Sequence, residues 1–161
     1  MTAERKDLML PALDPATVPG RTGTIYPDPF RGRCADRLKQ VVGDPLGLTQ
    51  FGVNIVTLPP GSWSSQRHWH EAEDEFVCIL EGHVTLVTDQ GPQVMGPGSV
   101  AGFPAGRADG HHLINETDQP VRFLVVGSRA DSERAFYPDI DLQYERDNGR
   151  NRFTDRTGKP Y

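Results

Sequence analysis

Short runs of hydrophobic and β-branched residues, separated by turn residues, recur through the middle of the chain. Residues 50–58 are rich in β-formers and end at a Pro-Pro-Gly turn. Residues 75–80 and 84–87 flank Gly82 and predict a hairpin. Similar runs follow at residues 93–95, 100–103, 111–115 and 121–126. Repetition at about 8–12 residues with turn signals between the runs is typical of a sandwich or barrel, so the sequence predicts one all-β domain.

The two ends of the chain lack this pattern. Five prolines within residues 1–35 are too many for a helix or a central strand, so we expect an irregular arm that lies across the main domain or a partner subunit. Residues 36–42 favour an edge strand, with a short helix as the alternative. The chain is polar again after Arg129 and is expected to wrap the outside. The expected organisation is an N-terminal arm (1–35), a barrel (36–130) and a C-terminal extension packed on the barrel (131–161).

Composition and charge narrow the class of protein. The chain has 161 residues and a net charge of −5, and acidic residues offset the arginines near the C-terminus, so no nucleic-acid partner is expected. The longest apolar run, residues 76–80, is far too short to cross a bilayer, and no secretory leader is recognisable. No membrane partner is therefore expected. Cys34 and Cys78 are interpreted as reduced thiols of a cytoplasmic protein, with one disulfide as the alternative.

A group of histidines and a glutamate has the spacing of a metal site. His68 and His70 are two residues apart, so on a strand both side chains face one cavity, while Trp69 faces the opposite side. Glu75 follows at the start of the next strand. Imidazole nitrogen with carboxylate oxygen suits a divalent transition metal. The simpler alternative is a polar strand face in water, and the neighbouring Glu71, Glu73 and Asp74 are interpreted as a solvated turn.

Two motifs in these residues resemble those of the cupin superfamily. The first consists of Gly61, His68, His70, Glu75 and Gly82, with six residues instead of five between Gly61 and His68. The second consists of Gly98, Pro104, Gly106, His111 and Asn115, with four residues instead of two between Gly106 and His111. The resemblance covers roughly residues 50–127. The flanks resemble those of small bacterial single-domain cupins.

The resemblance implies an antiparallel jelly-roll β-barrel that holds one divalent metal (Zn, Fe, Mn, Ni or Cu) inside. Its implied ligands are His68, His70, Glu75 and His111. The three-residue gap to Asn115 selects His111 over His112, which is then a surface or rim residue. The longer loop before His111 leaves one alternative open, in which a shift of register makes His112 the ligand.

Other polar residues of the barrel are candidates for contact with a substrate. Ser64 and Gln66 share strand parity with the two histidines and are expected at the cavity mouth, and Asn115 is added to this set. The alternative is that they line the barrel without touching a ligand. His83 is expected to be an exposed turn residue. No catalytic residue is assigned, because Glu75 would be a ligand and no second carboxylate is placed inside.

The expected function is that of a metal-binding single-domain cupin acting on a small oxygen-rich molecule. Sugars, sugar acids, phenolic compounds and diketone-like compounds fit this description, and the candidate reactions include dioxygenation and isomerisation. The alternative is a non-catalytic cupin that binds or senses a small ligand or a metal. The partners expected are a small-molecule ligand and a second copy of the chain, because neither arm has a core of its own and cupins often exchange such segments.

Overall fold

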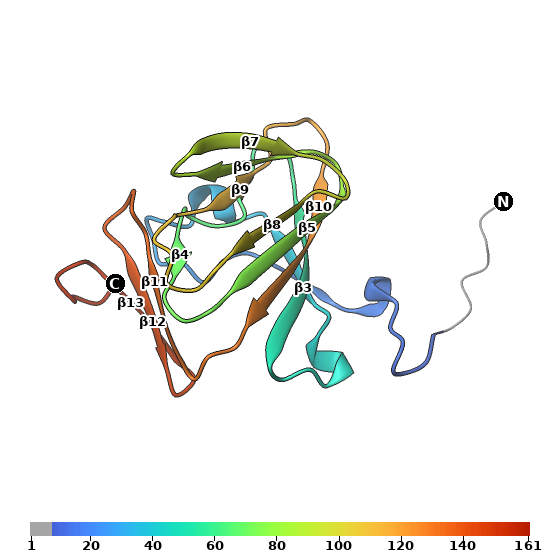
Figure 1. Ribbon diagram of the computed structural model, residues 1–161, viewed down its shortest axis with the longest axis horizontal. Coiled ribbons are helices and arrows are strands. Elements are labelled where there is room, and N and C mark those ends of the chain that lie inside the picture. Colours follow the sequence, from blue (N-terminus) through green and yellow to red (C-terminus); the bar gives the residue numbers. More distant parts are fainter. Residues whose placement is uncertain (1–7) are drawn as a thin grey trace.

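The computed structural model describes residues 8–161 and is built almost entirely of strands (Figure 1). The largest sheet has six strands in the order β1 (Gly20–Thr22), β2 (Leu38–Val41), β3 (Phe51–Leu58), β10 (Val121–Ser128), β5 (Glu75–Glu81) and β8 (Val100–Phe103). A second sheet has the order β7 (Gly91–Met95), β6 (Val84–Thr88) and β9 (His112–Ile114). A third has the order β13 (Arg150–Thr154), β12 (Gln143–Asp147), β11 (Ser132–Phe136) and β4 (Trp69–His70). Short 3-10 turns occupy η1 (Pro15–Thr17), η2 (Gly32–Cys34) and η3 (Asp44–Leu46).

The main hydrophobic core lies between the six-stranded and three-stranded sheets. It joins side chains of β3, β5 and β10 to side chains of β6, β7 and β9, and Leu58, Val121 and Phe123 are almost completely buried. Alternation along each strand directs one set of residues into this core, as Val77 and Ile79 on β5 illustrate. The predicted all-β cupin jelly roll is thereby confirmed.

Glycines of the two motifs stand at sharp turns between these strands. Gly82, which joins β5 to β6, has φ +79°, and a Cβ there would lie 3.0 Å from the carbonyl oxygen of Pro120. Only glycine combines this left-handed backbone with such a close approach at low cost. The turn therefore depends on the glycine that the motif supplies.

The structure gives the C-terminal segment more order than the sequence suggested. Residues expected to form an irregular extension form the antiparallel strands β11, β12 and β13, drawn in orange and red in Figure 1. Residues 132–136 alternate between exposed and more buried positions, a strand pattern that charged side chains obscure in the sequence. β11 pairs with β4, so this sheet reaches the histidine motif directly.

The N-terminal arm packs against the same chain. Tyr26 and Cys34 are buried in a second core with Tyr137 and Leu142. Val18 is buried in a third cluster, against the side chains of Val42 and Ile55. The two arms thus find apolar partners within the same chain, and this weakens the physical reason for which we expected a dimer. Residues 1–7 of the predicted arm lie outside the described residues.

Cys34 and Cys78 form no disulfide, which agrees with the prediction of two free thiols rather than with the alternative of one disulfide. Burial raises the pKa of the Cys34 thiol to about 11, which keeps it protonated and unreactive at neutral pH. Across residues 8–161, no helix has the length and apolar character needed to cross a membrane.

Candidate metal centre

His68 and His111 face each other across an isolated antiparallel bridge. The amide of His111 donates to the carbonyl of His68 at 2.8 Å, and the reverse bond is 3.2 Å long. Nδ1 of His68 lies 2.9 Å from the carbonyl oxygen of Gln66, a position that favours a proton on Nδ1. Nε2 of His68 then carries a free lone pair, and this tautomer of the imidazole is the one that can bind a metal through Nε2.

His70 lies beside His68, as the spacing of two residues predicts. Its Nε2 is 3.1 Å from Nε2 of His68 and 3.7 Å from Oε2 of Glu75. The other ring nitrogen, Nδ1, is buried 3.5 Å from Oε1 of Glu133, whose side chain is completely buried on β11. The pairing of β4 with β11 brings this carboxylate behind the imidazole.

Glu75 and His111 complete the group. Oε1 of Glu75 lies 3.3 Å from Nε2 of His111. The ring of His111 stacks on Phe103 with centroids 3.6 Å apart, and Phe103 is the residue paired with Glu75 across β5 and β8. Within residues 8–161, Nδ1 of His111 has no hydrogen-bond partner.

The electrostatics of the group are strongly coupled. Burial lowers the pKa of His68 to about 3, with smaller contributions from His70 and His111. Burial also opposes the charged form of His70, but the carboxylates of Glu133 and Glu75 outweigh it and raise its pKa to about 9. Burial acts to raise the pKa of Glu75, yet the facing histidines hold that pKa well below its usual value. The raised pKa of His70 and the lowered pKa of Glu75 make these two an imidazolium and a carboxylate at neutral pH.

The residues present fit a divalent transition metal. Two ligand atoms bound to one ion at about 2.0–2.2 Å lie roughly 3–3.6 Å apart, and the distances of 3.1, 3.3 and 3.7 Å in this group are close to that range. Two imidazole nitrogens at 3.1 Å must otherwise share a single proton. His68, His70 and Glu75 also meet the geometric requirement for a common ion. Three of the four residues named from the sequence therefore meet this requirement, and His111 adjoins them through its contact with Glu75.

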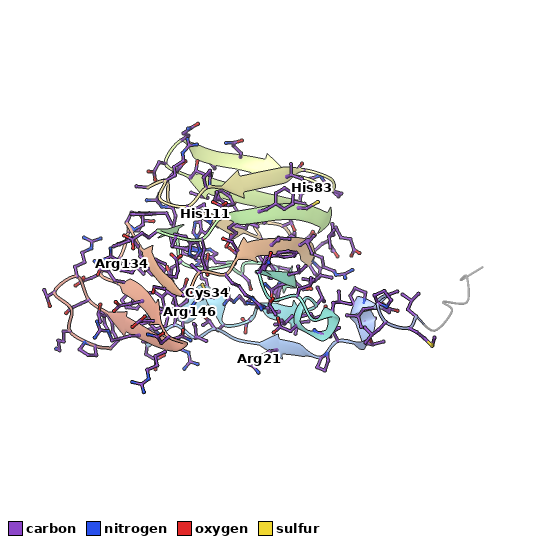
Figure 2. All side chains as sticks on the ribbon, turned by 60° about the horizontal axis from the view of Figure 1, so that its bottom comes forward. Arg21, Cys34, His83, His111, Arg134 and Arg146 are labelled. Atoms are coloured by element: carbon purple, nitrogen blue, oxygen red, sulfur yellow. The ribbon has the colours of Figure 1, made fainter. Side chains whose placement is uncertain are left out.

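The group opens into a cavity of about 490 Å³. Its walls come from β3, β5 and β10 on one side, from β11–β13 on another, and from residues 24–44 near the N-terminus. Figure 2 shows His111 near the centre of the molecule and Arg146, another lining residue, on the C-terminal strands. A volume of this size accommodates a small organic molecule.

The three candidate substrate residues have different positions. Ser64 lines the cavity, and its Oγ accepts a hydrogen bond of 2.9 Å from the amide of Leu113. Gln66 lies outside the cavity lining, and its amide donates to the carbonyl of Phe30. Asn115 is completely buried, and its Nδ2 donates to the carbonyls of Leu58 and Gln119. Asn115 therefore holds the turn after β9 rather than a ligand.

The remaining histidines separate clearly from the group. His112 is buried, so the predicted surface position is wrong, and it lines the same cavity as the group. Its ring packs edge-on against Trp63, and its Nδ1 lies 3.0 Å from the carbonyl of Ser65, because alternation turns it away from His111. His83 is exposed beside the β5–β6 turn, as predicted.

Two carboxylates near the group were not identified from the sequence. Glu133 accepts hydrogen bonds from the amides of Glu71 and Ala72 at 2.9 and 3.0 Å. Glu73 lines the cavity and forms an ion pair with Arg146, so its assignment to a solvated turn was wrong. Glu133 was detectable only through the alternation of residues 132–136, and Glu73 had no distinguishing signal.

Comparisons with known proteins agree with this architecture. A family model described as "Cupin domain" matches residues 54–127. A sugar phosphate isomerase of the cupin superfamily from Silicibacter pomeroyi is 44% identical, with a TM-score of 0.90 over 94% of this chain and 96% of that chain. A provisionally assigned sugar phosphate isomerase from Acidithiobacillus ferrooxidans is 30% identical, with a TM-score of 0.72 over 79% of this chain and 81% of that chain. A polyketide cyclase from Streptomyces resistomycificus is 27% identical, with a TM-score of 0.59 over 74% and 80% of the two chains. Among the curated proteins searched, none matches.

The chain belongs to the cupin superfamily. The match to the Silicibacter structure spans nearly the full length of both chains, so it includes the N-terminal arm and the C-terminal strands as well as the barrel.

Proposed function

We propose that the protein binds one divalent transition metal through His68, His70, Glu75 and His111. The observation that carries this proposal is the 3.1 Å approach of two imidazole nitrogens beside a carboxylate and a third imidazole. A hydrogen bond to Gln66 orients His68, and the carboxylate of Glu133 faces the back of His70. Such outer partners fix the direction of a ligand's lone pair.

We further propose that the protein is an enzyme acting on a small sugar-like molecule in the cavity, with isomerisation as the reaction. A divalent ion held by His68, His70, Glu75 and His111 would supply a Lewis acid for a substrate oxygen. The name of the Silicibacter relative supports isomerisation, and the cavity of about 490 Å³ suits a molecule of that size. The other substrate classes considered, including phenolic and diketone-like compounds, have no comparable support.

Isomerisation of a sugar requires a group that accepts and returns a proton. Glu73 is the cavity-lining carboxylate that lies outside the proposed ligand set yet within 4.8 Å of a nitrogen of His70, so it is our candidate for this role. Arg146 and the amide of Ala130 hold its Oε1, which fixes the direction of the carboxylate. This supplies the base that the sequence did not reveal.

Tyr137 is a second polar group at the site. Its ring stacks on His68 with centroids 5.8 Å apart, and burial keeps the pKa of its hydroxyl well above the usual value. The hydroxyl therefore stays protonated at neutral pH. Its hydrogen bond with Tyr26 fixes the direction of the hydroxyl beside His68.

The experiment is a substrate screen on metal-loaded protein. We expect conversion of at least one sugar, sugar phosphate or uronate to its isomer, followed by nuclear magnetic resonance, with no oxygen uptake. The Glu73→Gln variant should lose turnover by about 100-fold or more while it keeps its metal. Oxygen uptake with a catechol or diketone would instead establish a dioxygenase. Metal binding without any turnover would favour the non-catalytic binding or sensing cupin.

A further inference from the structure

The cavity carries more positive than negative side chains, although the whole chain has a net charge of −5. Four cationic residues line it: Arg37, Lys39, Arg129 and Arg146. Three carboxylates line it: Asp44, Glu73 and Glu75. A metal ion on the proposed ligands would add two further positive charges. The cavity therefore has a net positive charge, although the whole protein is acidic, and this charge favours the binding of an anion.

The carboxylates of the cavity are already engaged. Asp44 forms an ion pair with Arg129, and Glu73 forms one with Arg146. Glu75 belongs to the proposed metal ligands. Arg37 and Lys39 therefore remain in the cavity without a direct ion pair to any carboxylate of residues 8–161.

Arg37 is held in place by backbone carbonyls rather than by a counter-ion. Its Nε donates to the carbonyl of Gly23 at 3.3 Å, and its Nη1 donates to the carbonyl of Ser64. In the described part of the chain, Nη2 has no acceptor, so one end of the guanidinium is free. The positive charge of Arg37 also acts to lower the pKa of both Tyr26 and Tyr137, so it lies close to the side chain that stacks on His68.

Lys39 lies two residues further along the chain, on β2, where alternation directs its side chain to the same side as that of Arg37. It makes no hydrogen bond or ion pair with any described residue. Burial lowers the pKa of Lys39 and the charge of Arg37 lowers it further, so the two cations repel one another, although the charges of Glu75 and Asp44 act in the opposite direction. An anion between them would relieve this repulsion.

We propose that Arg37 and Lys39 form a phosphate-binding subsite, which takes the phosphate group of the substrate while other oxygens of that substrate reach the metal centre. This inference rests on the proposed function, because it places both groups in one cavity. Two adjacent cations match the double charge of a phosphate monoester. The free N–H groups of a guanidinium suit the spacing of phosphate oxygens. The subsite would select phosphorylated over free sugars.

The test measures binding of inorganic phosphate to the full-length, metal-loaded protein by isothermal titration calorimetry. Lys39→Gln is the main variant, because Lys39 supports no other described residue and its loss leaves the fold intact. Arg37→Lys keeps the positive charge but removes the planar guanidinium group with its several N–H donors. Arg122→Gln is the matched control, since Arg122 pairs with Glu81 outside the cavity and its loss changes the net charge equally. Metal content is measured for each variant.

We expect Lys39→Gln to weaken phosphate binding by about tenfold or more, Arg37→Lys to weaken it by a few-fold or more, and Arg122→Gln to change it by less than about twofold. Equal binding to all four proteins would show that phosphate binds only the metal or the general charge, and it would overturn the subsite. Acetate binding as tightly as phosphate would overturn the assignment to phosphate. Metal-loaded protein that fails to bind phosphate would end this inference but leave the proposed function intact. If no protein, the wild type included, contains metal and Lys39→Gln still loses phosphate binding, the subsite would stand and the proposed metal-dependent function would be contradicted.

Discussion

His68 and His111 lie directly opposite each other, joined by two backbone hydrogen bonds of an antiparallel bridge. The bridge fixes the register of the segment after the Arg107–Gly110 loop. Because neighbouring residues of an extended segment point to opposite sides, His111 faces Glu75 and His112 packs against Trp63. The two extra residues in the loop therefore do not bring His112 to the group in place of His111.

Metal binding should release a proton. Below about pH 9 the metal-free protein carries a proton on His70, because Glu133 and Glu75 stabilise the charged ring. A metal must displace that proton, so affinity should rise by up to tenfold per pH unit as the pH approaches about 9 and then level off. His68, with a pKa of about 3, releases none in this range. Calorimetric titration of Zn²⁺ at pH 7.5 in buffers of different ionisation enthalpy should give about one proton per ion. No proton release would contradict this protonation state.

Glu133 should support both the fold and the metal. Glu133→Ala leaves the amides of Glu71 and Ala72 without their acceptor, so we expect a loss of about 2–4 kcal/mol in the free energy of unfolding. Glu133→Gln keeps an acceptor and should lose less stability, but its metal affinity should fall by about 10–100-fold. Urea denaturation and competition with a metal chelator measure the two effects.

Glu145→Gln is the control for Glu133, because Glu145 pairs with Arg152 in an exposed ion pair. It should stay within about 0.5 kcal/mol of the wild type. Unchanged metal affinity in Glu133→Gln would show that His70 does not need its carboxylate partner.

Gly82→Ala should destabilise the hairpin more than Gly61→Ala. Both glycines have φ near +75 to +80°, but an added Cβ meets the carbonyl oxygen of Pro120 at 3.0 Å only in Gly82. We expect a loss of about 1 kcal/mol for Gly61→Ala and about 2–3 kcal/mol for Gly82→Ala, measured by urea denaturation. Equal losses would show that the turn relaxes around the new methyl group.

Removal of the N-terminal arm should lower stability, because Val18 and Tyr26 are buried against the barrel and the C-terminal strands. Deletion of residues 1–30 should cost about 3 kcal/mol or more in the free energy of unfolding. Deletion of residues 1–10 is the control, since Leu8, Met9 and Leu10 are exposed. Equal stability of the two truncated chains would contradict a structural role for the arm.

Dimerisation remains a prediction, and the exposed Leu8–Leu10 segment and Ile25 give the described arm apolar surface to offer a second copy. Sedimentation analysis should give twice the chain mass of 17.8 kDa for the full chain. Deletion of residues 1–10 should weaken the dimer. A monomer at all concentrations would reject it.

The fold and the histidine group were predictable because their signals are local. Strand alternation places His68 beside His70, and the Pro-Gly turns delimit the strands around them. The partners of the group were not predictable in this way. Glu133 and Arg146 come from a segment whose charged residues hide its strands, and Arg37 comes from beside a proline-rich arm. Only the pairing of β11 with β4 and the packing of the arm bring these side chains to the site.

Metal analysis of purified variants tests the central claim most directly. The wild type should contain about one divalent ion per chain, and His70→Ala and His111→Ala should contain almost none, while circular dichroism shows the same fold. His83→Ala, which alters an exposed residue, and His112→Asn, which keeps a donor towards Ser65, should retain the ion. Retention of metal in His70→Ala and His111→Ala, or its loss in His112→Asn with retention in His111→Ala, would contradict the proposed centre.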